Sequence, residues 1–201
     1  MKVNVNIIFY KVFVLILFFA MLPLMIFFGV LIYLFSGWPV FFIQKRVGKN
    51  GKVFEMIKFR TMTFGAHAKQ RKLIHLNEAD GPVFKIRNDP RFTTIGRFIS
   101  HMGLDELPQL FNVLKGEMAL IGPRPLPVDE EKKLKPWMRA RARILPGIIS
   151  PWVLDGYHTK SFDEWMNSDC EYAKTKSFQK DLILEIRAVE YMVKLIGRAT
   201  V

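Results

Sequence analysis

The sequence contains a single cysteine, Cys170, so it cannot form an internal disulfide. This pattern is typical of a protein kept in a reducing compartment. Its four histidines have none of the spacings that zinc ligands show, and we expect no zinc site. The sequence also lacks a Walker A loop, a dinucleotide-binding fingerprint and a nucleophile elbow. These absences argue against P-loop NTPases, dehydrogenases and α/β-hydrolases.

Charge is absent from residues 12–43, which include the apolar run FFAMLPLMIFFGVLIYLF. A soluble helix of this length does not need so many apolar residues, so the run is typical of a segment inside a membrane. A cleaved signal peptide is the alternative, but the run is too long for one and no small-residue cleavage site follows it. The turn residues Ser36-Gly37-Trp38-Pro39 come next. We therefore expect residues 1–43 to be a retained, membrane-inserted segment.

Pro23 lies near the middle of this segment. Because proline removes a backbone donor and clashes with the preceding turn, we expect a helix that is kinked or broken there. Two arrangements fit: a bent helix that spans the membrane, or a re-entrant helix that turns near Pro23 and leaves on the side it entered. Basic residues flank both ends, which favours the re-entrant form. They are Lys2, Lys11, Lys45 and Arg46.

Acidic residues are few, with 18 against 30 lysines and arginines, and the net charge is +12. The positive charge begins directly after the apolar run, so residues 44–201 are expected to face the cytoplasm. The excess of basic residues predicts anionic partners such as phosphates or lipid headgroups. Nucleic acid is disfavoured because basic and aromatic residues are not interleaved in a binding motif. We see no internal repeat and no second cytoplasmic domain.

The remaining pattern predicts a mostly α fold with little or short β-structure. Residues 53–59 suit a short strand or an irregular extended stretch. Five helices are predicted, at residues 66–78, 94–101, 104–116, 130–143 and 179–196. The fourth is basic with interspersed apolar residues, which is typical of a helix in the headgroup layer. The last has apolar residues at helical spacing and is predicted to pack on the core through them. They are Leu182, Ile186, Val189 and Val193.

Two adjacent acidic residues, Asp105 and Glu106, stand at the start of the predicted helix 104–116. The N–H groups and the dipole of a helix favour negative charge at this end. Asp105 therefore fits the common role of an N-cap. The same place also suits a phosphoryl group carried by Asp105 or held beside it. The residues alone leave both interpretations open.

The string GPRP at 122–125 predicts a stiff turn. Each proline fixes its own φ and restricts the residue before it, so Arg124 is held between Pro123 and Pro125 with little freedom. A guanidinium held this way suits bidentate binding of phosphate, although an exposed turn with an incidental arginine fits as well. Lys58 and Arg60 share one side of an extended segment. They either bind phosphate or lie in solvent or at the membrane.

Taken in order, these motifs resemble those of the bacterial sugar transferase family, in particular the small monotopic polyprenyl-phosphate phosphoglycosyl transferases. The resemblance runs through nearly the whole chain. Its most specific part is LDELPQLFNVLKG at 104–116 next to IGPRP at 121–125. Other matching strings are KFRTM at 58–62, DPRFT at 89–93, PGI at 146–148 and DCEY at 169–172.

The resemblance implies a single monotopic domain on a bacterial inner membrane, with a re-entrant helix, interfacial amphipathic helices and a catalytic part that faces the cytoplasm. It implies that Asp105 attacks the sugar-bearing phosphate of a UDP-sugar, releases UMP and passes the phosphosugar to polyprenyl (undecaprenyl) phosphate. This transfer would begin the assembly of a lipid-linked glycan. Mg²⁺ is expected at Asp105 and Glu106, and a homodimer is compatible with this interpretation. The resemblance adds as substrate-binding residues Lys58, Arg60, Arg91, Pro123, Arg124, Pro125 and Asp169.

The chain departs from the family's pattern in four places. Leucine precedes Pro23 where serine is usual, and Ser100 stands where an arginine shortly before the dyad is usual. Ile149 begins the pair that replaces the usual Thr-Gly, and the stretch that ends in Tyr157 lacks the usual glutamine and arginine. A catalytically weak or inactive binding or assembly protein of the same fold is therefore the alternative hypothesis.

Overall fold

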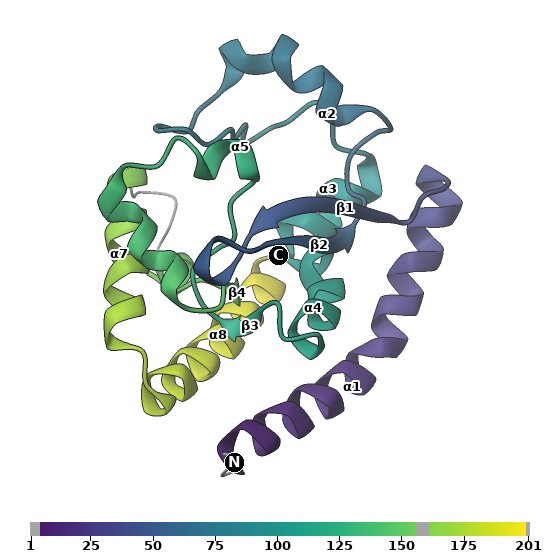
Figure 1. Cartoon of the computed structure of the whole chain (residues 1–201). Coiled ribbons are helices and arrows are strands. Elements are labelled where there is room, and N and C mark those ends of the chain that lie inside the picture. The colour runs from purple at the N-terminus through teal and green to yellow at the C-terminus, as the bar shows by residue number, and fades with distance from the viewer. Residues whose placement is uncertain (1–4, 156–160, 200–201) are drawn as a thin grey trace.

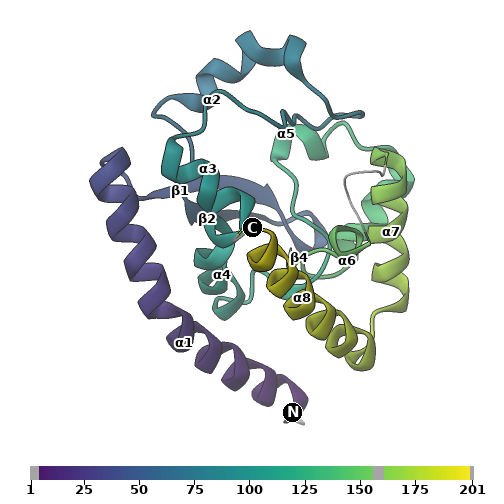
Figure 2. The same ribbon diagram turned by 180° about the vertical axis from the view of Figure 1, so that it is seen from behind.

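The computed structural model describes residues 5–155 and 161–199, and Figures 1 and 2 show its arrangement from two sides. These residues are mostly helical, as predicted, with two small sheets. The α-helices are α1 (Val5–Ser36), α2 (Ala66–Lys69), α3 (Thr94–His101), α4 (Leu110–Leu114), α5 (Val128–Glu131), α6 (Pro151–Leu154), α7 (Phe162–Thr175) and α8 (Phe178–Ala199). The 3₁₀ helices are η1 (Lys49–Gly51), η2 (Gln70–Leu76), η3 (Leu104–Gln109) and η4 (Pro136–Arg143). The strands are β1 (Phe41–Val47), β2 (Val53–Phe59), β3 (Ala119–Ile121) and β4 (Gly147–Ile149).

Helix α1 is one helix of 32 residues that continues through Pro23. It changes direction about midway along its length (Figures 1 and 2). Its stretch Ile8–Ser36 is long and apolar enough to cross a membrane, and 11% of its most apolar window is buried. The helix ends at Ser36, where Gly37 takes φ 72° and its N–H bonds the carbonyl of Tyr33 at 3.0 Å. The turn predicted at 36–39 is therefore confirmed.

Two parts of α1 pack on the rest of the molecule, which we call the body. Near its start, Val14 belongs to a buried cluster that includes Met118 and Leu120. Near its end, Phe28 and Ile32 belong to a second buried cluster, with Phe59 and Ile99 among its members. Val14 and Ile32 are about 27 Å apart along the helix axis at 1.5 Å per residue. The helix therefore lies along the body (Figure 1).

The hairpin of β1 and β2 is antiparallel and pairs Phe42 with Lys58. The second sheet pairs β3 with β4 in parallel, with Ile121 opposite Ile149. A Cβ atom at Gly147 would lie 2.0 Å from the backbone nitrogen of Gly122, so only glycine allows these two segments to approach so closely. This contact holds the predicted PGI string against the start of the GPRP loop.

Several predicted elements are confirmed. Residues 53–59 form β2, and residues 94–101 form α3, which Thr93 caps by accepting a hydrogen bond from the N–H of Gly96 at 3.0 Å. The segment 104–116 is helical up to residue 114, but its first half is the 3₁₀ helix η3 and only its second half is α-helix. Residues 66–78 are likewise mainly 3₁₀ helix, because α2 ends at Lys69 and η2 continues to Leu76.

The single helix predicted for residues 130–143 is wrong. Lys135 has an extended backbone with ψ 151°, so the segment is divided into α5 and η4. The residue before a proline is disfavoured in the helical region, and Pro136 follows directly. The predicted helix had therefore been extended across a proline that begins a new element.

The packing face predicted for the last helix is also wrong. Helix α8 includes residues 179–196, but among its described side chains Leu184 and Ala188 are the buried apolar ones. The four residues expected in the core are 47–65% exposed. Apolar periodicity identifies a stripe along a helix, but it does not identify what covers that stripe.

Candidate active site

Asp105 lies in the first turn of η3, after a sharp reversal at the end of α3. Gly103 makes this reversal with φ 69°, a conformation that glycine adopts without strain. Gly103, and not Asp105, is the N-cap of η3, and no side chain caps this end. The N-cap interpretation of Asp105 is therefore wrong. Its carboxylate faces the ammonium group of Lys58, with 3.6 Å between Oδ2 and Nζ.

The environment of Asp105 changes its acidity. The side chain is 7% exposed, and burial raises the pKa of Asp105 to about 6, against the opposing attraction of Lys58. Lys58 is near the end of β2, is 23% exposed at its side chain and lies 5.9 Å from the ring centroid of Phe42. Above this pKa the site holds a buried carboxylate beside one partly exposed cation.

Glu106 faces a second cation from another part of the chain. One of its carboxylate oxygens, Oε1, accepts a hydrogen bond from Nη2 of Arg124 at 2.6 Å. The two side chains are 17% and 35% exposed. Each acidic residue of the dyad is thus paired with its own cation. Lys58 of β2 pairs with Asp105, and Arg124 of the GPRP loop pairs with Glu106.

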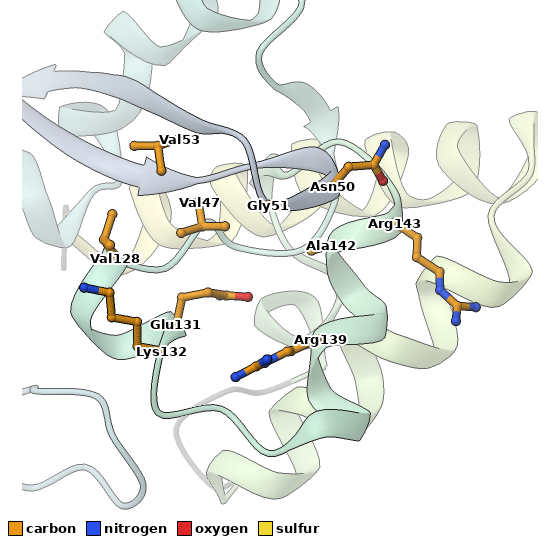
Figure 3. Close-up of a pocket in the computed structure, with 10 residues that line it drawn as sticks. All are labelled: Val47, Asn50, Gly51, Val53, Val128, Glu131, Lys132, Arg139, Ala142 and Arg143. Carbon is orange, nitrogen blue, oxygen red and sulfur yellow. The ribbon is translucent and has the colours of Figure 1, made fainter.

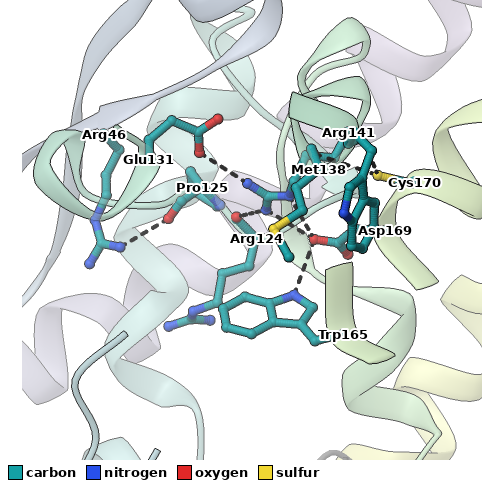
Figure 4. Close-up of polar contacts among 10 residues, drawn as sticks. Arg46, Arg124, Pro125, Glu131, Met138, Arg141, Trp165, Asp169 and Cys170 are labelled. Atoms are coloured by element: carbon teal, nitrogen blue, oxygen red, sulfur yellow. Dashed lines mark hydrogen bonds and ion pairs between the residues drawn. The ribbon is translucent and has the colours of Figure 1, made fainter. Parts of the chain in front are cut away.

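Four successive carbonyl groups of the GPRP loop and the residue after it accept hydrogen bonds. Pro123 accepts from the N–H of Gly147 at 3.0 Å, and Leu126 accepts from the N–H of Val47 at 3.0 Å. Between them, the carbonyl of Pro125 accepts from the Arg46 guanidinium at 2.9 Å, and the carbonyl of Arg124 accepts from Arg141 (Figure 4). The loop that presents Arg124 is therefore held at each residue.

Asp169 is fully buried in α7. Its Oδ2 accepts hydrogen bonds from Nε of Arg141 at 3.0 Å and from the indole N–H of Trp165 at 3.1 Å, and it forms an ion pair with Nη2 of Arg141 at 2.9 Å. Burial raises the pKa of Asp169 to about 6, against the attraction of Arg141. Asp169 is therefore connected to the backbone of Arg124 by the Arg141 side chain, which binds both, as Figure 4 shows.

Arg60 and Arg91 are both 7% exposed and are engaged in contacts that hold the fold. Arg60 donates to the carbonyls of Ser36 and Gly37 at the end of α1. Arg91 forms a close ion pair with Asp89 at 2.6 Å and also donates to a backbone carbonyl. Their binding to substrate phosphate stays a prediction, and both have a structural role in addition.

Sequence reasoning missed several residues that support the site. In the sequence, Arg46 indicates only a positive charge beside the apolar run, and Arg141 indicates only one cation of the expected helix 130–143. Asn112 was not singled out, yet its side chain bonds β2 in the way a neighbouring strand would. Its Oδ1 accepts from the N–H of Ile57 at 3.1 Å, and its Nδ2 donates to the carbonyl of Glu55 at 2.8 Å. These bonds hold β2 and Lys58 against α4.

Among the described residues, no group of three or more His, Cys, Asp and Glu residues could hold a metal ion. Asp105 and Glu106 nevertheless offer two adjacent carboxylates. This donor set fits Mg²⁺, which is often bound through one or two carboxylates with substrate phosphates and water completing the coordination.

A cavity of about 500 Å³ lies at the other end of the hairpin from Lys58. Its lining comes from the hairpin tip, α5 and η4 (Figure 3). Because Lys58 is near the opposite end of β2, this cavity is separate from the acidic dyad.

The positions that depart from the family's pattern lie in different surroundings. Ser100 is on α3, one turn before the Gly103 reversal, and Ile149 is on β4 opposite Ile121. Tyr157 lies outside the described residues.

The family model described as "Bacterial sugar transferase" matches residues 1–195. The chain belongs to the bacterial sugar transferase family. The resemblance inferred from the DELPQLFNVLKG and GPRP strings is thereby confirmed.

Curated relatives match most of the length of this chain. The galactosyl transferase CpsE of Streptococcus agalactiae is 39% identical over 163 residues, which are 81% of this chain and 36% of that protein. An undecaprenyl-phosphate galactose phosphotransferase of Salmonella typhimurium is 33% identical over 84% of this chain and 37% of its own length. The exopolysaccharide production protein ExoY of Rhizobium meliloti is 31% identical over 79% of this chain and 72% of its length. The chain thus spans little more than a third of the first two.

Proposed function

We propose that this protein is a phosphoglycosyl transferase that moves a sugar 1-phosphate from a UDP-sugar to polyprenyl phosphate. The observation that carries the proposal is the Asp105–Glu106 dyad, in which two adjacent carboxylates each face a cation. The names of two relatives support the substrate class. One is an undecaprenyl-phosphate galactose phosphotransferase. The other is a UDP-N-acetylgalactosamine-undecaprenyl-phosphate N-acetylgalactosaminephosphotransferase of Aeromonas hydrophila.

In the first step, an Asp105 carboxylate oxygen attacks the sugar-bearing phosphorus of the UDP-sugar. The bond from that phosphorus to the bridging oxygen breaks, and UMP leaves with the electron pair. The product is an acyl phosphate that carries the sugar on Asp105. A carboxylate nucleophile divides a difficult displacement into two easier ones, so donor and acceptor need not be bound together.

In the second step, an oxygen of polyprenyl phosphate attacks the same phosphorus. The Asp105 carboxylate leaves with its electron pair, and the product is a diphosphate-linked lipid sugar. Lys58 and Arg124 lie where they would offset the negative charge that a carboxylate and a diphosphate bring together. Glu106 is the candidate for accepting a proton from the lipid phosphate.

Asp105 and Glu106 are also the residues that would hold Mg²⁺. When bound, this cation would neutralise phosphate charge at the dyad. Lys58 and Arg124 would then move away from the carboxylates toward the substrate phosphates.

The packing of α1 supports a monotopic, re-entrant arrangement. The body contacts α1 near Val14 and again near Ile32, about 27 Å apart. A helix that crossed about 30 Å of hydrocarbon would carry the body into the bilayer with it. Both ends of α1 are instead expected on the cytoplasmic side of the bacterial inner membrane. The exposed stripes of α1 and α8 would face the lipid.

Topology can be tested with a single cysteine placed at residue 3 in a Cys170→Ala background. The re-entrant arrangement predicts protection from an impermeant thiol reagent in intact spheroplasts and labelling after lysis. A cysteine at Lys52, on the exposed hairpin tip, serves as the control for the cytoplasmic side. Labelling of residue 3 before lysis would establish a spanning helix.

The chemistry is tested by mass spectrometry of purified protein incubated with Mg²⁺ and a panel of UDP-sugars without lipid. We expect UMP release and a sugar-phosphate adduct on Asp105, which Asp105→Asn removes. Asp163→Asn is the matched control, since Asp163 is 55% exposed and pairs with Lys135 on the surface. If no adduct forms and no UMP appears even with polyprenyl phosphate, the binding or assembly role motivated by Ser100 replaces this proposal.

A further inference from the structure

We propose that Arg141 is a positioning residue that sets the direction of Arg124 by holding its backbone carbonyl. Arg141 is 3% exposed and lies in η4, and its guanidinium donates to the carbonyl oxygen of Arg124. In Figure 4 the Arg124 side chain extends away from Arg141 while its carbonyl faces it. Arg141 therefore acts on the loop backbone and leaves the Arg124 guanidinium for Glu106.

The guanidinium of Arg141 is itself fixed by two carboxylates from different elements. Nε and Nη2 meet Asp169 of α7 at 3.0 and 2.9 Å, and Nη1 meets Glu131 of α5 at 3.3 Å. A planar guanidinium with three anchored nitrogens has little freedom to rotate. The Arg124 carbonyl is the third acceptor of this guanidinium. It is thus bound by a group that Asp169 and Glu131 hold in place.

The flanking prolines make this one bond decisive for the loop. Pro123 and Pro125 have fixed φ angles, and Pro125 also restricts Arg124 to extended backbone. Holding the Arg124 carbonyl removes most of the remaining rotation about ψ of that residue. The side chain then leaves the backbone in one direction, toward Glu106 at 2.6 Å.

A second ion pair joins nearby parts of the same two elements and serves as a matched control. Lys135, directly before η4, bonds Asp163 of α7 with 3.0 Å between Nζ and Oδ2. The side chains of Lys135 and Asp163 are 59% and 55% exposed, and neither residue belongs to the GPRP loop. Lys135→Gln therefore weakens the same interface without changing the support of Arg124.

Arg141→Lys keeps the charge but cannot reach two carboxylates and a carbonyl at once. Amide hydrogen exchange measured by mass spectrometry is the first readout, on peptides that carry the N–H groups of Gly122, Gly147 and Val47, which bond to or from the loop at 3.0 Å. We expect faster exchange there in Arg141→Lys and, more weakly, in Glu131→Gln, and no change in Lys135→Gln. Unchanged exchange in both test variants would overturn the proposal, whether or not the protein is an enzyme.

The second readout rests on the proposed function and uses UMP release from a UDP-sugar. We expect kcat/KM to fall about 10- to 100-fold in Arg141→Lys and less than about twofold in Lys135→Gln. In an Arg124→Ala background the further loss from Arg141→Lys should shrink to less than about twofold, because residues that act as a unit are not additive. Full additivity of the two losses would show that Arg141 acts elsewhere. Absence of UMP release in the wild type would count against the proposed function alone and leave hydrogen exchange to decide.

Discussion

Asp105 and Asp169 occupy two regions of the molecule and share most of the features used to identify catalytic carboxylates. Both are almost fully buried, burial raises the pKa of both to about 6, and both are paired with a cation. Their partners differ. Lys58 is a point charge 3.6 Å from Asp105, whereas Arg141 binds Asp169 through two nitrogens at 2.9 and 3.0 Å with Trp165 as a third donor. A raised pKa marks both sites, but only the loosely held carboxylate can leave its cation for a substrate.

The largest difference between the two aspartates is expected in turnover. Asp105→Asn should reduce UMP release by roughly 10³-fold or more, because the proposed nucleophile is lost. Asp169→Asn should reduce it only about 10- to 100-fold, because Asp169 acts through Arg141 and Arg124. Steady-state assays of the two purified variants at pH 8 test this order. Equal losses would mean that the two regions are not distinct in function.

Stability should show the reverse order. Arg141→Met should lower the free energy of unfolding by about 3–5 kcal/mol, because it leaves buried Asp169 without its cation. Lys58→Met should cost about 1 kcal/mol or less, since Lys58 is partly exposed and Asp105 can then bind a proton. Chemical unfolding in one detergent, with Lys135→Gln as the surface control, provides the comparison. A cost for Lys58→Met as large as that for Arg141→Met would refute the distinction between a loose and a tight pair.

The pH dependence of stability follows from the raised pKa values. Both aspartates keep their protons up to about pH 6 in the folded protein, whereas they lose them near pH 4 in the unfolded chain. Proton binding by the two aspartates therefore contributes to the free energy of unfolding. This contribution is complete below pH 4 and is lost as the pH rises through 6. Asp105→Asn removes one of the two groups. It should therefore stabilise the protein at pH 7.5, by up to about 3 kcal/mol for a shift of about two pKa units, and the gain should vanish near pH 4. Thermal unfolding of both proteins across this pH range is the measurement. A stabilisation by Asp105→Asn that grew toward low pH would contradict the prediction.

The smallest effect is a shift in the pH profile of the first step. In the proposed mechanism UMP release needs the Asp105 carboxylate, so its rate should rise through a midpoint near pH 6. Lys58→Met removes an attraction that favours the carboxylate and should move this midpoint upward by about one unit or less. Single-turnover rates between pH 5 and 8 give the midpoint, and Lys135→Gln should leave it unchanged. A downward shift would mean that Lys58 does not stabilise the carboxylate.

The sequence predicted the parts of the site that lie in contiguous strings. The dyad, the stiff loop around Arg124 and the apolar first helix all follow from local residue types and spacing. Arg141 could not be found this way, because its partners Asp169 and Arg124 are distant in the sequence and one of its contacts is a backbone carbonyl. Asn112 was missed for the same reason, since it bonds the backbone of β2.

Errors in the predicted fold have local and tertiary causes. The helix assigned to 130–143 ignored the restriction that Pro136 places on Lys135, which the sequence itself contains. The error in α8 has a different origin. Its apolar stripe through Leu182 and Val189 was recognised correctly, but the core is contacted by a second face that contains Leu184 and Ala188. Which of two apolar faces packs on a body depends on the three-dimensional arrangement.

The attachment of α1 along the body has a practical consequence for handling the protein. Removing residues 1–36 to obtain a soluble version would uncover Met118 and Leu120 at one end and Phe59 and Ile99 at the other. It would also remove the Ser36 carbonyl, one of the two that the Arg60 guanidinium binds. The apolar helix is therefore part of the folding unit, and biochemical work should start from the intact chain in detergent or lipid nanodiscs.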